Sequence, residues 1–258
     1  MIRRPPRSTQ GVSSAASDVY KRQLISLFMF VSFADELPAN FSKYQTHYAF
    51  KCDHAEKCAA AFDKYMNTPE VKAMNLEVDL YALEHQGWNE ATHQVSYYYK
   101  DANEYAMAGN FYSTSKAGLT FRNTMNKLGA EIIMSSMTRH IAANVSDNPG
   151  SELVTVNWDM NVSNPVEFLP LWIELSKSTE KYDWNADGCG VQQHILGNNG
   201  NGITHNVWCV FSSPQAALSF LDNYIATPEF AEYSTKVGDH RTFLRSHMSF
   251  LLKEYNPD

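Results

Sequence analysis

The sequence lacks the short motifs that mark many enzyme families. It contains no GxSxG, no HExxH, no P-loop and no GxGxxG that follows a predicted strand. The tripeptide "GCG" at 188–190 has no downstream helix of the kind that a phosphate cradle needs. Motifs alone therefore assign no catalytic chemistry to this chain.

Clusters of basic residues are also missing beyond residue 23, and long apolar runs are missing beyond residue 34. The 258 residues carry 21 Lys and Arg against 28 Asp and Glu, a formal net charge of −7. A chain with this balance is a poor binder of DNA, RNA or anionic lipid surfaces, so nucleic-acid binding is excluded. After residue 34, no apolar run is long enough to cross a bilayer.

The first 23 residues resemble translated sequencing-library adapter. "MIRRPPRST" and "SSAASDVYKRQ" back-translate in one frame to the two constant parts of a transposon-type adapter. Their charges would also suit a signal-peptide n-region, but the length and the Ser/Ala-rich middle do not. We therefore expect residues 1–23 to be adapter-derived and not natural protein. Without them, 16 basic and 27 acidic residues leave a net charge of −11.

The next segment, "LISLFMFVSFA" at 24–34, has the length of a secretory h-region. Ser32 and Ala34 supply the small residues of a cleavage site, which would leave a mature protein starting at Asp35. The alternative is a buried strand or helix. The first interpretation predicts an exported protein, periplasmic or extracellular, with no membrane span in the mature chain.

Export gives the four cysteines a possible structural role. Cys52 and Cys58 are close in sequence, and Cys189 and Cys209 flank a turn centred on "GNNGNG". Two disulfides, Cys52–Cys58 and Cys189–Cys209, are the natural pairing, and four buried free thiols are the alternative. Neither pair has the CxxC spacing of a zinc site.

Internal similarity indicates a duplication. "THQVSYYYKDANEYA" (92–106) aligns without a gap with "THNVWCVFSSPQAAL" (204–218), and "SSM" (135–137) aligns with "SHM" (246–248). The two offsets are 112 and 111 residues. We expect repeats at 44–145 and 152–255, joined through "SDNPGS", whose Asn-Pro-Gly is typical of a loop.

Each repeat predicts the same order of elements. β-branched and aromatic runs predict strands, and apolar residues at helical spacing predict helices, as in "AEKCAAAFDKYM" and "VEFLPLWIELSKS". Pro170 is expected in the first turn of the latter helix. The order is β-α-β-β-α-β twice, the ferredoxin-like pattern. Trp208 and Val210 make the second face of one strand apolar, so we expect the two sheets to pack against each other.

This element order and apolar pattern resemble the dimeric α+β barrel superfamily, here fused in one chain. That superfamily includes antibiotic-biosynthesis-type monooxygenases and stress-responsive A/B-barrel proteins. The helix openings "ATPEF" (226–230) and "NTPEV" (67–71) add to the resemblance. It implies an α+β fold in which two ferredoxin-like βαββαβ repeats pack sheet-to-sheet as an intrachain pseudo-dimeric α+β barrel. The protein would be a monomer with an internal pseudo-twofold axis.

Histidines and acidic residues offer weak metal-site candidates. On each predicted hairpin, two histidines could face each other from neighbouring strands and bind a transition metal. These are His85 with His93 and His194 with His205. Asp183, Asn185 and Asp187 superficially resemble a calcium loop, but His194 stands where the bidentate Glu should be. Rim histidines and an Asx-turn loop are the simpler interpretations, so we expect no metal and no cofactor.

The predicted ligand site lies on the first strand of each repeat. In monooxygenases of this superfamily, an Asn on the first strand can position substrate or oxygen. The resemblance implies the same role for Asn157. His47 holds the equivalent position in the first repeat. We expect Asn157 to face a cavity between sheet and helices, with indoles in its wall, the candidates being Trp158, Trp172 and Trp208. Packing of these aromatics in the core is the alternative.

Three functions remain open from the sequence. The first is an exported barrel that binds a small apolar or aromatic molecule. The second is a cofactor-independent monooxygenase or isomerase acting on such a molecule, which would need His or Asn within reach of the substrate. The third is a structural or partner-binding module without a pocket. The sequence names neither a ligand nor a reaction.

Overall fold

A computed structural model describes residues 37, 41–85, 90–145, 153–197 and 202–256. The expected adapter-derived segment 1–23 and signal-peptide remnant 24–34 lie outside the described residues. Within the described ranges, no helix combines the length and the apolar character that crossing a bilayer requires.

The first half of the chain follows the predicted order of elements, with its helices divided. In sequence it contains β1 (Tyr44–Lys51), α2 (Ala55–Met66), α3 (Pro69–Lys72), β2 (Val78–Glu84), β3 (His93–Tyr99), α4 (Ala102–Thr114), α5 (Lys116–Lys127) and β4 (Glu131–Val145). Local side-chain chemistry sets the helix boundaries. Asp101 caps α4 by accepting from the backbone N–H of Asn103 and Glu104. Ser115 ends α4 and caps α5.

The second half repeats this order. It contains β5 (Val154–Val162), α6 (Pro165–Thr179), β6 (Gly188–Leu196), β7 (His205–Phe211), α7 (Pro214–Tyr224), α8 (Pro228–Val237), the short 3₁₀ turn η3 (Gly238–His240) and β8 (Arg241–Tyr255). Thr227 caps α8 through its side chain, whereas Thr68 makes no such bond at α3. Pro170 lies in the second turn of α6 and not in the first, because this helix already begins at Pro165.

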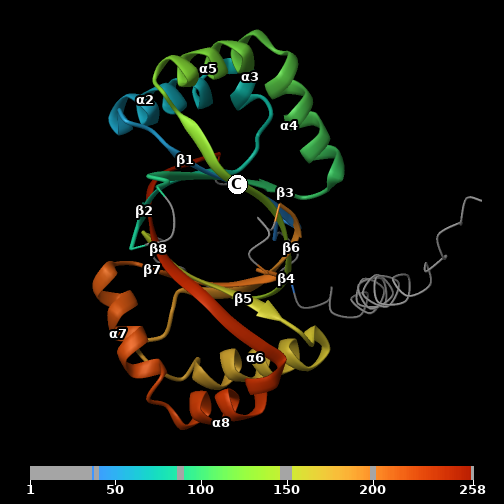
Figure 1. Cartoon of the computed structure of the whole chain (residues 1–258), viewed down its shortest axis with the longest axis vertical. Coiled ribbons are helices and arrows are strands. Elements are labelled where there is room, and N and C mark those ends of the chain that lie inside the picture. The colour runs from blue at the N-terminus through green and yellow to red at the C-terminus, as the bar shows by residue number, and fades with distance from the viewer. Residues whose placement is uncertain (1–36, 38–40, 86–89, 146–152, 198–201, 257–258) are drawn as a thin grey trace, which may run out of the picture. The chain divides into compact units, whose positions relative to one another are not determined.

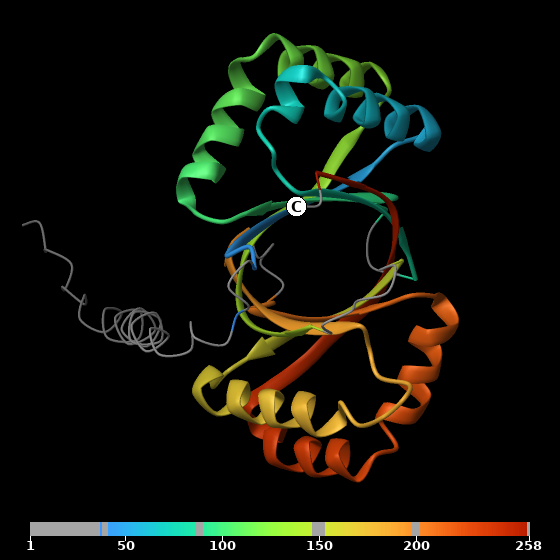
Figure 2. The ribbon, with the colours of Figure 1, turned by 180° about the vertical axis from the view of Figure 1, so that it is seen from behind.

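All eight strands form one closed barrel in the order β1-β3-β2-β8-β5-β7-β6-β4. The helices lie outside it, α2–α5 on one side and α6–α8 on the opposite side (Figures 1 and 2). The expected α+β barrel is therefore confirmed, whereas the expected packing of two separate sheets is replaced by one continuous sheet. Antiparallel pairing of β2 with β8 and of β4 with β6 joins the halves at their edges. Closure satisfies backbone groups that separate sheets would leave unpaired.

The apolar core lies between the barrel wall and the helices. In the first half, Phe62 is 1% exposed and contacts Phe121 and Tyr255 edge-on. In the second half, Phe220 stacks on Tyr224 at 4.5 Å between ring centroids. Burying one such side chain contributes roughly 2 kcal/mol. These two clusters hold the helices against the outer face of the barrel.

Both pairs of cysteines are joined in disulfides. Cys52–Cys58 connects the residue after β1 to the first turn of α2. Cys189–Cys209 joins directly opposed residues of β6 and β7, with Cα atoms 4.1 Å apart. No free cysteine occurs among the described residues. The second disulfide faces α6 and α7, where it lies beside a cavity.

Candidate functional site

The barrel wall separates an apolar face from a polar one. Side chains alternate along each strand, so Val207 and Cys209 of β7 point towards the helices, while Trp208 points into the barrel. The inward-facing positions of the other strands are largely polar, as at His47, Ser96 and Gln192. The protein therefore has two chemically different cavities, one on each face of the same wall.

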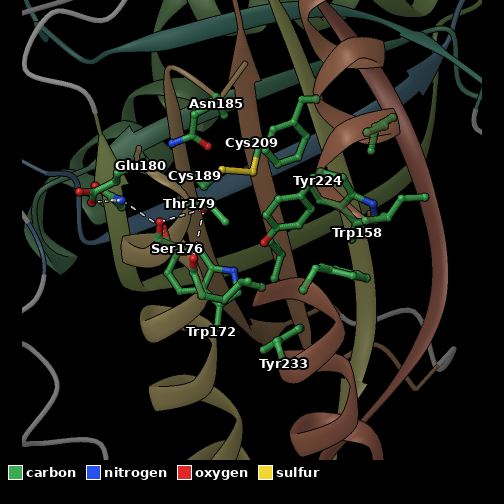
Figure 3. Close-up of a pocket in the computed structure, with 18 of the residues that line it drawn as sticks. Trp158, Trp172, Ser176, Thr179, Glu180, Asn185, Cys189, Cys209, Tyr224 and Tyr233 are labelled. Carbon is green, nitrogen blue, oxygen red and sulfur yellow. Dashed lines mark hydrogen bonds between the residues drawn. A yellow bond between two sulfur atoms is a disulfide. The ribbon is translucent and has the colours of Figure 1, made fainter. Parts of the chain in front are cut away.

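The larger cavity, about 800 Å³, lies between the outer face of β5, β6 and β7 and the helices α6–α8. We call it the helix-side cavity. Its wall combines aromatic rings with the Cys189–Cys209 disulfide, as Figure 3 shows. The rings belong to Trp158, Trp172, Phe220, Tyr224, Phe230, Tyr233 and Phe243. This volume is within the range of small-molecule sites in proteins.

Several polar side chains also border the helix-side cavity. Asn144 of β4 donates to Ser176 Oγ at 3.1 Å and to Glu180 Oε1 at 2.7 Å, both on or next to α6. Arg241 lies over the ring of Tyr233, with the guanidinium carbon 5.5 Å from the centroid. Burial raises the pKa of the Tyr224 and Tyr233 phenols, so both are uncharged donors at neutral pH.

The smaller cavity, about 430 Å³, lies inside the barrel and is bordered by residues from all eight strands. We call it the lumen cavity. His47 is fixed there by hydrogen bonds to Ser96 Oγ at 3.1 Å and Thr138 Oγ1 at 3.2 Å. Burial, with nearby His194 contributing, lowers the pKa of His47 to about 3. The imidazole is therefore neutral at physiological pH.

A second hydrogen-bonded group occupies the lumen beside His47. Gln45 Oε1 accepts from Gln192 Nε2 and lies 3.1 Å from His140 Nε2. Burial lowers the pKa of His140 to about 3, with nearby His47 contributing. Aromatic rings cover this group, since Phe41 contacts His140 edge-on and stacks parallel to Trp208. This part of the lumen is therefore built from neutral polar groups and aromatic faces.

A carboxylate that sequence reasoning missed lies at another part of the lumen. Asp79 of β2 is 6% exposed, and its Oδ2 accepts the hydroxyl protons of Tyr81 and Tyr98, each at 2.7 Å. Its Oδ1 is buried and has no hydrogen-bond partner among the described residues. Burial raises the pKa of Asp79 to about 6, against the two tyrosine hydrogen bonds, which lower it.

The predicted site residues separate onto the two faces of the wall. Trp158 and Trp172 border the helix-side cavity, whereas His47, Asn157 and Trp208 border the lumen cavity. The expected position of Asn157 between sheet and helices is therefore wrong. Trp158 is the next residue on an alternating strand, and because its ring packs on the helix side, Asn157 faces inward. A role of Asn157 in binding stays a prediction.

The histidine pairs expected across the hairpins do not face each other. His93 pairs with Ala82 and stacks on Phe50, away from His85, while His205 pairs with Gln193 and not with His194. In the described part of the chain, no three His, Cys, Asp or Glu side chains are grouped to hold a metal ion. Asn185 and Asp187 instead border the helix-side cavity.

Position 190 must be glycine, because the Trp208 indole fills the space that a side chain there would occupy. The two residues are directly opposed on β6 and β7, and a Cβ at Gly190 would overlap the Trp208 ring. We expect Gly190→Ala to displace the indole and to lower the free energy of unfolding by about 1–3 kcal/mol, measured by urea denaturation. Gly109 of α4 has open space around its Cα, so Gly109→Ala should instead stabilise by about 0.5–1 kcal/mol. Equal effects would contradict this assignment.

Comparisons with known proteins connect the chain to a fold. No protein-family model and no curated protein matches the sequence. Among solved structures, a Fusobacterium nucleatum protein provisionally named a monooxygenase has a TM-score of 0.60 and 14% identity, covering 84% of this chain and 96% of its own. An anthrone oxidase-like protein has a TM-score of 0.54 and 12% identity, covering 84% and 94%.

A third neighbour is a heme-binding protein from Thermus thermophilus, with a TM-score of 0.51 and 10% identity over 84% of this chain and 96% of its own. At such identities the likeness concerns the fold alone. This chain has a mixed α+β fold built on a closed antiparallel barrel of eight strands, consistent with the dimeric α+β barrels.

Proposed function

We propose that this protein binds a small apolar or aromatic molecule in the helix-side cavity. The observation that carries the proposal is a cavity of about 800 Å³ walled by indole, phenol and phenyl rings, with polar side chains at part of its border. Apolar walls supply affinity by removing ligand surface from water, and the polar groups orient the ligand. Asn144, Ser176 and Arg241 are the groups placed to do so.

Binding is favoured over catalysis by what borders this cavity. The residues predicted for oxygenase or isomerase chemistry, His47 and Asn157, lie in the lumen on the other face of the wall. Asn144 and Asn185 do border the helix-side cavity, but the amide of Asn144 is already bonded to Ser176 and Glu180. Among the described residues that border the cavity there is also no histidine, and both cysteines form the disulfide. These residues do not fit a histidine- or thiolate-ligated haem, so we derive no step through haem.

Two structural aspects belong to the same proposal. Residues 44–145 and 152–255 are proposed as ferredoxin-like repeats fused into a monomeric pseudo-dimer. The order β4-β1-β3-β2 in the first half and β8-β5-β7-β6 in the second supports this, because each half arranges its strands identically. Export remains a proposal from the sequence, and the two disulfides are consistent with it.

Filling the cavity tests the proposal. Ala186 borders it, so Ala186→Phe should occupy ligand space. We expect the affinity for 1-naphthol, measured by calorimetry, to fall at least about tenfold, because a tenfold change corresponds to only about 1.4 kcal/mol. Native mass spectrometry of the purified protein should also show a retained mass that Ala186→Phe loses.

The matched control is Ala59→Phe, an equal enlargement of a partly buried alanine in α2 of the other half. It should leave 1-naphthol binding unchanged. Near-UV circular dichroism of both variants establishes that each is folded. An unchanged affinity in folded Ala186→Phe, or an equal loss in Ala59→Phe, would contradict binding in the helix-side cavity.

A further inference from the structure

We propose that the lumen cavity is a second binding site, and that its ligand is a small organic cation, an amine whose ammonium group lies on Asp79. This site is independent of the helix-side cavity, because the barrel wall lies between them. Four features of the lumen support the proposal: its charge, an unpaired buried oxygen, its aromatic wall and its size.

The charge of the lumen cavity is of one sign. Three carboxylates border it, Glu77, Asp79 and Glu254, and no Lys or Arg is among the described residues that do. Asp79 and Glu254 are directly opposed on β2 and β8, so their charges repel. The two histidines at the border, His47 and His140, have a pKa lowered to about 3 by burial and stay neutral. At neutral pH the cavity therefore favours a cation.

Asp79 provides an acceptor with a vacant position. Tyr81 and Tyr98 both donate to Oδ2, which holds the carboxylate in one orientation. The buried Oδ1 has no partner among the described residues, although an unsatisfied buried oxygen is costly to a fold. An ammonium group supplies both the missing hydrogen bond and the compensating charge, and such charge-assisted bonds are among the strongest in proteins.

Aromatic faces complete the site. Tyr81, Tyr98, Trp208 and Phe41 all border the cavity, and ring faces of this kind attract organic cations. A volume of about 430 Å³ accommodates an amine that carries one ring. A hydrated inorganic ion would leave these apolar faces without a partner, so the aromatic wall selects an organic amine.

Benzylamine and benzyl alcohol test the site, because they share one shape and differ in charge. At pH 7.5, calorimetry should show that the full-length protein binds benzylamine at least about tenfold more tightly than benzyl alcohol. Asp79→Asn preserves the side-chain shape and removes the charge, so it should abolish this preference. Glu254→Gln, which changes an exposed carboxylate at the border, should weaken benzylamine binding about two- to threefold.

The matched control is Asp187→Asn, which removes a carboxylate from the helix-side cavity and should leave the preference unchanged. Four results would overturn the proposal: no benzylamine binding, equal affinity for amine and alcohol, a preference that persists in Asp79→Asn, or a preference lost in Asp187→Asn. If Asp79→Asn does not fold, the proposal is tested by the amine preference of the wild type and by the benzylamine affinity of Glu254→Gln. The 1-naphthol experiment tests the helix-side cavity separately, so one of the two binding proposals can be contradicted while the other stands.

Discussion

Lowering the pH from 7.5 to 5 is expected to reduce the free energy of unfolding by about 4 kcal/mol or more. Burial lowers the pKa of His140 and His205 to about 3, and these side chains are 4% and 1% exposed. Each imidazole is neutral in the fold but takes up a proton in the unfolded chain below its ordinary pKa of about 6.5. At pH 5 the loss is roughly 2 kcal/mol for each.

The direction of this effect follows from the depressed pKa values. Stability is fully present above about pH 6.5 and is lost progressively as the pH falls towards about 3. His47, His194 and His247 act in the same direction, since burial lowers their pKa as well. Asp79 acts in the opposite direction, because burial raises its pKa to about 6. Its protonation in the fold removes roughly 1 kcal/mol of the cost of burying a carboxylate between about pH 6 and 5. The histidines outnumber it, so acid destabilises the fold.

Urea denaturation at the two pH values measures this effect. His205→Leu should remove about 2 kcal/mol of the pH dependence, because His205 packs in the apolar layer beside Phe168. His54→Gln changes an exposed histidine before α2 and should leave the pH dependence as it is. With typical domain stabilities of about 5–15 kcal/mol, the wild type should remain folded at pH 5 but unfold at a clearly lower urea concentration than at pH 7.5. Equal stability at both pH values would show that the imidazoles are solvated.

The second large effect is expected at the buried ion pair of the barrel interior. Arg245 Nε of β8 lies 2.6 Å from Asp159 Oδ2 of β5, and the two side chains are 15% and 7% exposed. Asn206 Nδ2 donates to the other carboxylate oxygen at 3.0 Å. Arg245→Met should lower the free energy of unfolding by about 3–5 kcal/mol, because it leaves a buried carboxylate without its cation.

The double variant Arg245→Met/Asp159→Asn separates charge from packing. Removing both charges should recover most of the loss, since neutral groups tolerate burial better than a single charge. Lys236→Met serves as the surface control, because Lys236 pairs with Glu232 where both side chains are largely exposed. That change should cost less than about 1 kcal/mol. A double variant as unstable as Arg245→Met would assign the effect to lost packing.

Much of the fold could be predicted because strand alternation and helical spacing are local properties. β3 and β7 lie at equivalent positions within the aligned segments 92–106 and 204–218, and α2 covers the predicted helix. Closure of the barrel could not be predicted from these local patterns. It depends on pairing between residues as distant as Val78 and Tyr255, for which neither strand carries a local signal.

The site was predicted less well, because the sequence shows which residues share a face but not what that face meets. Asn157 was expected to share a cavity with indoles that included Trp158, whereas these two adjacent residues face opposite sides of the barrel wall and border different cavities. Asp79 and Tyr81 alternate with Val78 and Leu80, a pattern that marks an inward polar face. The same alternation at Gln45/His47 and Gln94/Ser96 could have predicted a polar lumen.

Closure of the barrel also bears on synthesis of the chain. β8 follows the other seven strands of the barrel in the chain, and it pairs with both β2 and β5. A nascent chain that has emerged only as far as β7 therefore carries two unpaired strand edges and a barrel open to solvent. Unpaired edges are templates for aggregation, so the ribosome-bound intermediate is the form most in need of a chaperone. Translation arrest before residue 241 should yield insoluble product, while full-length chains fold to a barrel without free edges.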